Sequence, residues 1–254
     1  MTALPAPLLP ELLAELRAEE GVRAVVLTGS HARGEADAWS DLDLAVLVTE
    51  DRLARDTVAY RKGRLVSVER RTVAERGRAF AEPEAALWNL EALRTGQALH
   101  DPHGIFAALQ ARARAFAWAE VETQAHLRAG QLIAGMAEEV HKVMGGLHAG
   151  DGGKVLYAAA GMTFALGTAA LLDTGTLIPT ENRYLALAQG AWTDPAWHSA
   201  YGTLAGLTDA AWSRRGRAGL RPYGRAVALA RWPDGSPQEL AQEAASKAAA
   251  FLSA

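Results

Sequence analysis

Cysteine is absent from the 254 residues of this chain. Its absence excludes disulfide bonds and metal sites built from thiolate ligands. The N-terminal segment, residues 1–20, also lacks a basic stretch ahead of its apolar residues, so it does not resemble a secretory signal peptide. Both observations predict a cytoplasmic protein.

An excess of either charge is missing as well. The chain has 26 basic and 29 acidic residues, which gives a formal net charge of -3. Such a chain exerts no broad attraction on a phosphate backbone or an anionic membrane, and no run of lysines or arginines suggests a local exception. We therefore expect neither long nucleic acids nor membranes as partners, while the oligomeric state stays open.

Strongly hydrophobic runs are scarce. Residues 155–172 are close to membrane-spanning length, but they consist mostly of Ala, Gly and Thr, which makes the segment weakly hydrophobic. A helix buried in a helical domain explains the segment better. Apolar residues make up 50% of the chain, which is enough for a sizeable core.

The N-terminal part of the chain alternates between strand and helix signals. Leucines at helical spacing predict a helix over 9–19, and short apolar runs predict strands over 23–28, 42–48 and 64–70. The intervening segments predict a turn with a short helical turn over 29–34, a loop over 36–40 and a short polar helix over 51–61. Together these elements predict a small α/β domain with a mixed sheet over residues 1–80.

From Pro83 onward the periodicity is helical. Glycines and prolines separate the helical segments. The predicted helices cover residues 83–94, 102–117, 119–145, 153–172, 180–190, 195–212 and 236–252. The fold class is therefore α+β, with an all-α domain over residues 81–254.

Two carboxylates stand at alternate positions where the second strand begins. Asp41 and Asp43 are separated by one residue, so in a strand their side chains leave the same face. Like charges so close together repel, and a hard cation such as Mg²⁺ relieves the repulsion while sharing its coordination with substrate phosphates. The pattern predicts a magnesium site for a nucleoside triphosphate.

A glycine-serine turn precedes the two carboxylates. Gly29 and Ser30 follow the first predicted strand and open a short helix, where backbone N–H groups attract anions and glycine permits close approach. The Ser30 hydroxyl and Arg33 can add donors to phosphate oxygens, although Arg33 could equally be an ordinary surface charge. Ser40, directly before Asp41, is a further candidate contact to the nucleotide.

A third acid stands near the end of the third predicted strand. If this strand lies beside the second, Glu69 can complete the cluster as a metal ligand or as the base for an attacking hydroxyl. Alternatively, Glu69 is an ordinary solvated glutamate at the end of a strand, with no catalytic role. Glu75 and Asp37 are weaker candidates, and because the chain has no Gly-Lys-Ser/Thr sequence, a P-loop is excluded.

These motifs resemble those of the nucleotidyltransferase superfamily of DNA polymerase beta. The signature of that superfamily is Gly-Ser, a spacer, and Asp-x-Asp between apolar residues, which here are Gly29-Ser30 and Asp41-Leu42-Asp43. The resemblance covers about residues 20–70. Residues 99–102 also resemble a junction in bacterial members with helical second domains, such as the aminoglycoside and lincosamide nucleotidyltransferases.

The resemblance implies a reaction and its cofactors. Members transfer a nucleoside monophosphate, here expected to be AMP, from a nucleoside triphosphate to a hydroxyl and release pyrophosphate. Two Mg²⁺ ions are held by the carboxylates, here Asp41, Asp43 and Glu69. The helical domain of such relatives covers the acceptor, and Glu138, Glu139, His141 and Lys154 are its candidate contributors in this chain.

Three functions remain open at this stage. The first is an enzyme that modifies a hydroxyl of a small molecule, and an aminoglycoside-like antibiotic is one candidate acceptor. The second is an enzyme that modifies a protein or an RNA, as toxin-antitoxin nucleotidyltransferases do. The third is a nucleotide-binding module without turnover, because the same motif would survive a loss of activity. The tryptophans at 88, 118, 192, 197, 212 and 232 are expected to pack between helices.

Overall fold

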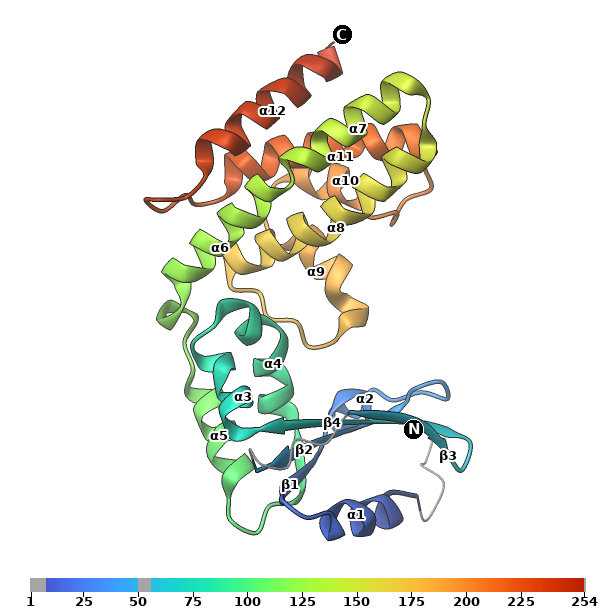
Figure 1. Ribbon diagram of the computed structural model, residues 1–254, viewed down its shortest axis with the longest axis vertical. Helices are drawn as coiled ribbons and strands as arrows, with labels where there is room; N and C mark the ends of the chain where they lie inside the picture. The colour runs from blue at the N-terminus through green and yellow to red at the C-terminus, as the bar shows by residue number, and fades with distance from the viewer. Residues whose placement is uncertain (1–7, 50–55, 254) are drawn as a thin grey trace. The chain divides into compact units, whose positions relative to one another are not determined.

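The computed structural model describes residues 8–49 and 56–253 of the chain (Figure 1). The chain forms two compact units, Met1–Ala117 and Trp118–Ala254. The first contains a mixed sheet with helices and the second is helical, so the predicted α+β class is confirmed. The boundary expected between residues 80 and 81 lies inside the first unit. The assignment of nucleotide transfer to residues 1–80 and of acceptor binding to residues 81–254 stays a prediction.

The first unit is built on a five-stranded sheet with the order β3-β4-β2-β1-β5. Strands β2 and β4 run parallel, and the other neighbouring pairs are antiparallel. The strands cover Val22–Leu27 (β1), Leu42–Val48 (β2), Thr57–Arg61 (β3), Arg64–Thr72 (β4) and Gln97–His100 (β5). The three predicted strands are β1, β2 and β4, which are confirmed, whereas β5 was not predicted.

Helix α1, Leu8–Ala18, packs its leucines against one face of this sheet. Alternate residues of β2 and β4, among them Leu44 and Val66, are buried in the same cluster. The remaining helices of the unit are α2 Gly29–Arg33, α3 Val73–Gly77, the 3-10 turn η2 Arg78–Phe80, α4 Pro83–Thr95 and α5 Ile105–Ala115. The polar residues of β2 therefore lie on the sheet face opposite α1.

The polar helix expected over 51–61 is wrong where the structure can test it. Residues 51–55 lie outside the described residues, and Thr57–Arg61 is strand β3, paired antiparallel with β4. Lys62 and Gly63 connect the two strands with φ values of 50° and +76°. Positive φ at both central residues matches the right-handed twist of a hairpin, so this two-residue turn favours a strand over a helix.

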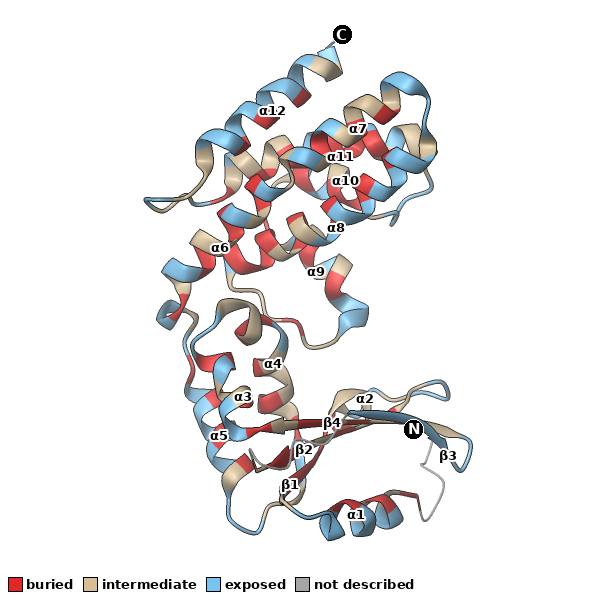
Figure 2. Ribbon diagram, in the orientation of Figure 1, coloured by how far each residue is buried: buried red, intermediate tan, exposed pale blue. Residues whose placement is uncertain are grey.

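The second unit consists of helices packed around α8, Gly152–Thr174. The others are η3 Trp118–Glu120, α6 Glu122–Gly135, α7 Ala137–Ala149, η4 Glu181–Arg183, α9 Tyr184–Gly190, α10 Pro195–Leu204, α11 Trp212–Leu229 and α12 Gln238–Ser253. In the described chain, α8 is long and apolar enough to cross a membrane by length and composition, and 61% of its apolar window is buried. Figure 2 shows buried residues along α8, and its packing against α6, α7 and α11 is that of a core helix.

Helix boundaries in this unit differ from the prediction at two places. The helix expected over 119–145 is divided at Met136 into α6 and α7. The helix expected over 195–212 ends at Leu204, and α11, which was not predicted, begins at Trp212. Trp192 and Trp197 are buried and pack edge to face at 4.7 Å, as expected for packing tryptophans.

Candidate functional site

The antiparallel pairing of β1 and β2 brings the end of one strand to the start of the other. Leu27 of β1 lies opposite Leu44 of β2, so the turn after β1 lies beside Asp43. The Thr28 backbone N–H donates to the Asp43 carbonyl oxygen at 3.0 Å. Two segments separated along the chain are thus held together by the sheet itself.

Gly29 makes the closest contact in this arrangement. Its φ is +64°, a left-handed conformation that glycine adopts without steric cost. A Cβ atom placed on Gly29 would lie 2.0 Å from Asp43 Oδ2. The Asp43 carboxylate therefore lies directly against the glycine backbone, in space that no other residue type leaves open.

Asp41 lies one residue before β2 and Asp43 lies inside it. Both are half-buried, whereas Leu42 between them is fully buried in the cluster beneath α1. This alternation directs the two aspartates to the face of the sheet opposite α1. Paired carboxylate oxygens next to a glycine that admits close approach fit a hard cation such as Mg²⁺.

The loop before Asp41 is organised by one carboxylate. Asp37 accepts the backbone N–H groups of Trp39 and Ser40 at 2.8 and 2.9 Å, and the Ser40 hydroxyl donates to it at 3.0 Å. The hydrogen bond from the Trp39 backbone, followed by that from the Ser40 hydroxyl, lowers the pKa of Asp37. Asp37 and Ser40 thus stabilise the loop, and the contact of Ser40 with the nucleotide stays a prediction. Trp39 projects from the same loop with 94% of its surface exposed.

Arg64 holds this loop from the start of β4. Its Nη1 donates to the carbonyl oxygens of Ala38 at 3.0 Å and Ser40 at 2.8 Å. The parallel pairing of β2 and β4 explains the proximity, because the starts of the two strands lie at the same edge. Arg64 therefore positions the backbone immediately before Asp41.

His31 of α2 interacts electrostatically with Asp41. Burial and the positive charge of Arg64 lower its pKa, and Asp41 opposes them. Its Nε2 is enclosed and has no hydrogen-bond partner among the residues that the structure describes. The imidazole is therefore neutral at neutral pH.

Glu69 lies on the strand expected for a third acid. Strand β4 does pair with β2, but Glu69 lies opposite Ala45, and Ser67 lies opposite Asp43. The offset of two residues corresponds to roughly 7 Å along the strand. The Glu69 carboxylate is bound by Arg76 and by Arg71 at 3.1 Å.

Residues 8–49 and 56–253 contain no group of three or more His, Asp or Glu side chains that could hold a metal ion. The role of Glu69 as a third ligand or a base stays a prediction. Glu75, the weaker candidate, has a structural role, since it forms a capping box with Thr72 at the start of α3.

Comparison with known proteins places the first unit in a family. The family model described as a nucleotidyltransferase domain matches residues 9–87, a segment that contains Gly29, Asp41, Asp43 and Glu69. The first unit carries a nucleotidyltransferase domain. The matched family is one of enzymes, and residues 88–254 lie outside the match.

A solved structure gives a more distant similarity. It is a nucleotidyltransferase-like protein from Exiguobacterium sibiricum, with 15% sequence identity and a TM-score of 0.49. The similarity covers 94% of this chain and 76% of the other. No curated protein matches the sequence.

Three other predicted residues, Arg33, Glu138 and Glu139, have structural partners. Arg33 is half-buried and its Nε donates to Glu35 at 2.9 Å. In the second unit, Glu138 and Glu139 both bind Lys142, at 3.0 and 2.7 Å. These two acids raise the pKa of Lys142.

Lys154 lies in the first turn of α8. Its backbone N–H donates to the capping residue Asp151 at 3.0 Å. Any role of Lys154, His141 or the two glutamates in substrate binding stays a prediction.

Sequence reasoning missed three residues beside the aspartate pair. Trp39 stands in a polar loop immediately before the Asp-x-Asp motif, and an aromatic residue in such a loop is a signal that could have found it. Arg64 and His31 carry no comparable signal. Their proximity to Asp41 depends on strand pairing, which the local sequence does not reveal.

Proposed function

We propose that the nucleotidyltransferase domain transfers a nucleoside monophosphate, AMP, from a nucleoside triphosphate to a hydroxyl group of a small molecule. The observation that carries the proposal is the contact between the Asp43 carboxylate and Gly29, with Asp41 at the alternate position on the same face. In the reaction the acceptor oxygen forms a bond to the α-phosphorus. The bond from that phosphorus to the bridging oxygen breaks, pyrophosphate leaves, and the acceptor proton passes to a carboxylate or to water.

The residues of the proposed site have three roles: metal binding, phosphate binding and positioning of the loop. Asp41 and Asp43 would hold Mg²⁺, two ions by the family resemblance, and the Ser30 hydroxyl and Arg33 would donate to the triphosphate oxygens. Bound Mg²⁺ supplies neutralisation of phosphate charge and activation of the acceptor hydroxyl. Arg64 and Asp37 keep the loop before Asp41 in place through the hydrogen bonds described above.

The acceptor is proposed to be a small molecule of the aminoglycoside or lincosamide type. The net charge of -3 supports a cationic acceptor over a nucleic acid. The exposed ring of Trp39, two residues before Asp41, offers an apolar face for stacking on a ring of the acceptor or the nucleobase. Acceptor recognition is assigned to the helical residues 81–254, and the protein is proposed to be cytoplasmic.

The test is pyrophosphate release. The protein is incubated with each of the common nucleoside triphosphates, Mg²⁺ and a panel of hydroxyl acceptors that includes aminoglycosides and lincosamides. We expect release with ATP that EDTA, Asp41→Asn or Asp43→Asn abolishes. Asp209→Asn is the matched control, because Asp209 is an exposed acid in a loop of the second unit.

Three results would count against the proposal. Undiminished pyrophosphate release by Asp43→Asn would show that the active site does not lie at Asp41 and Asp43. Triphosphate binding without turnover on any acceptor would make the protein a nucleotide-binding module. Labelling of a co-expressed protein or RNA, with none of the small molecules modified, would change the acceptor class.

Glu69→Gln tests the third acid. The side chain of Arg76 is only 9% exposed and its other described donor bond is to Asn89 Oδ1 at 3.1 Å, so loss of the Glu69 charge destabilises the fold by roughly 1–3 kcal/mol. Arg76→Gln breaks the same ion pair and is the matched control. We expect similar losses of stability in urea unfolding, but a larger loss of turnover in Glu69→Gln. Equal losses of turnover would make Glu69 a partner of Arg76 only.

A further inference from the structure

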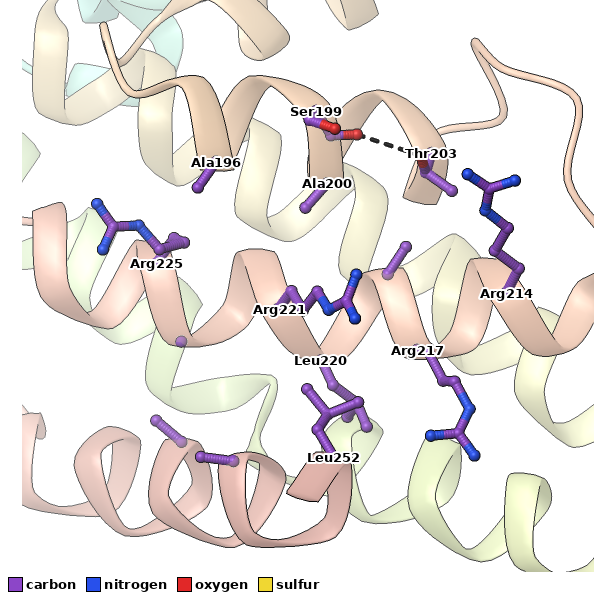
Figure 3. Close-up of a pocket in the computed structure, with 14 residues that line it drawn as sticks. Ala196, Ser199, Ala200, Thr203, Arg214, Arg217, Leu220, Arg221, Arg225 and Leu252 are labelled. Carbon is purple, nitrogen blue, oxygen red and sulfur yellow. Dashed lines mark hydrogen bonds between the residues drawn. The ribbon is translucent and has the colours of Figure 1, made fainter. Parts of the chain in front are cut away.

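Four arginines of α11 line one cavity of the second unit. Arg214, Arg217, Arg221 and Arg225 are spaced at three or four residues, so they follow one face of the helix. The cavity has a volume of about 670 Å³, within the range of sites that hold small organic ligands. Figure 3 shows these arginines in succession along α11, between α10 and α12.

The walls that face the arginines carry no acid. Helix α10 contributes alanines and the hydroxyl residues Ser199 and Thr203, and α12 contributes Ala245, Ala249 and Leu252. None of the residues lining the cavity is Asp or Glu. The cavity therefore combines an apolar wall, two hydroxyl groups and a row of guanidinium groups.

The positive charge of this row is mostly uncompensated. Arg225 is bound by Asp194, with Nε at 3.2 Å from Oδ1. For Arg214, Arg217 and Arg221, the described part of the chain provides no acidic partner. Like charges four residues apart destabilise a helix by a few tenths of a kcal/mol, so the row does not serve the stability of α11.

Exposed arginines are usually solvated surface charges, and two features distinguish these. They share a single cavity, and they surround an apolar floor in which Leu220 and Ala218 are buried, at 1% and 6% exposure. A guanidinium group binds phosphate through two parallel N–H donors. The row extends over roughly 16 Å of helix, which is long enough to contact more than one phosphate group.

We infer that this cavity binds a small organic molecule that carries two or more phosphate groups. Arg217 and Arg221 bind the phosphates, and Ser199 and Thr203 add hydroxyl donors. The organic part of the ligand packs on Leu220, Leu252 and the alanines of α10 and α12. The inference concerns only the second unit and does not depend on the reaction proposed for the nucleotidyltransferase domain.

The test is calorimetric titration of the full chain with two probes, inorganic tripolyphosphate and ATP, in EDTA so that no metal supports binding at Asp41 and Asp43. We expect both probes to bind, and ATP to bind more tightly because its nucleoside covers the apolar wall. Arg217→Gln/Arg221→Gln should weaken both affinities at least tenfold. Arg17→Gln/Arg114→Gln, which removes the same charge from exposed arginines of α1 and α5, should leave them unchanged.

Several outcomes would overturn the inference. One is that neither probe binds. Another is that the Arg217→Gln/Arg221→Gln variant binds both probes with the affinity of the wild type. If ATP bound no more tightly than tripolyphosphate, the proposed contact between an organic group and the apolar wall would be wrong. Binding only to vesicles with anionic phospholipids, or only to single-stranded RNA, would assign the cavity to a macromolecule. If the glutamine pair does not fold, Arg217→Lys/Arg221→Lys replaces it, and an unchanged affinity there would also overturn the inference, because lysine lacks the two-donor geometry.

Discussion

At the scale of single residues, the site depends on one backbone position that admits a carboxylate. Gly29 has φ +64°, and Asp43 occupies the volume that a side chain there would need. The same turn carries a second left-handed glycine, Gly34, with φ +72°, which has nothing within 4 Å of a Cβ position. A substitution at Gly34 strains only the backbone, whereas a substitution at Gly29 also displaces the Asp43 carboxylate. Comparing the two variants therefore separates these two effects.

Gly29→Ala should abolish most of the activity. The new Cβ must displace the Asp43 carboxylate, and a displacement of about 1 Å in a catalytic group can lower turnover about 10²-fold. Turnover with ATP and an accepted small molecule is the measurement. Gly34→Ala, the control, has only the left-handed strain of roughly 1–2 kcal/mol, so it should lower stability and retain turnover. Equal activity of the two variants would contradict the assigned role of the Gly29 contact.

The aspartates and the glycine could be predicted because their signal is local. Asp41, Asp43, Gly29 and Ser30 stand at fixed spacing between two apolar runs, and strand alternation gives the direction of both acids. The position of Glu69 could be predicted only as far as its strand. Its register opposite Ala45, and its ion pairs, depend on strand pairing and on α3, which no local pattern specifies.

At the scale of elements, the errors follow from local composition. Helix α11 contains three glycines and a proline, which favour a loop by intrinsic propensity. Tertiary packing reverses that preference, since a Cβ on Gly216 would lie 2.4 Å from Val155 Cγ1 and one on Gly219 would lie 3.1 Å from Leu204 Cδ1. The glycines permit close approach between helices. Strand β3 was missed because its polar residues suggested a helix, whereas its turn favours a hairpin.

The start of α10 offers a prediction with a pH dependence. Asp194 caps this helix by accepting the Trp197 backbone N–H at 2.6 Å, and it also binds Arg225. The hydrogen bond from Arg225, followed by that from Trp197, lowers the pKa of Asp194 from its ordinary value of 3.8. A lowered carboxyl pKa contributes stability that is fully present above pH 3.8 and is lost as the pH falls through the folded-state value.

Asp194→Asn keeps a capping acceptor and removes the charge, so it should lower the Tm at neutral pH. The difference from the wild type should shrink as the pH falls below 3.8. Thermal unfolding followed by circular dichroism over this range measures it. Asp151→Asn is the control, because Asp151 caps α8 through the Lys154 N–H and should change the Tm less. A difference that stays constant with pH would exclude the Arg225 ion pair as its cause.

At the scale of the whole molecule, the periodicity of the sequence predicted the fold class. The change from mixed to helical periodicity near Pro83 gave the α+β class, and the structure confirms it. The compact units divide later, after Ala117, because α4 and α5 pack with the N-terminal unit. Periodicity identifies helices but carries no information on which core they join, so a unit boundary cannot be obtained from it.

The balance of charge over the whole chain supports one last prediction. With 26 basic and 29 acidic residues, the attraction for a phosphate backbone is weak, although α11 carries a local positive row. Filter binding at physiological salt should show no retention of duplex DNA or long RNA at micromolar protein. Arg217→Gln/Arg221→Gln should not change that result, since it concerns a cavity of small-ligand size. Retention that the double variant abolishes would show that the arginine row binds nucleic acid.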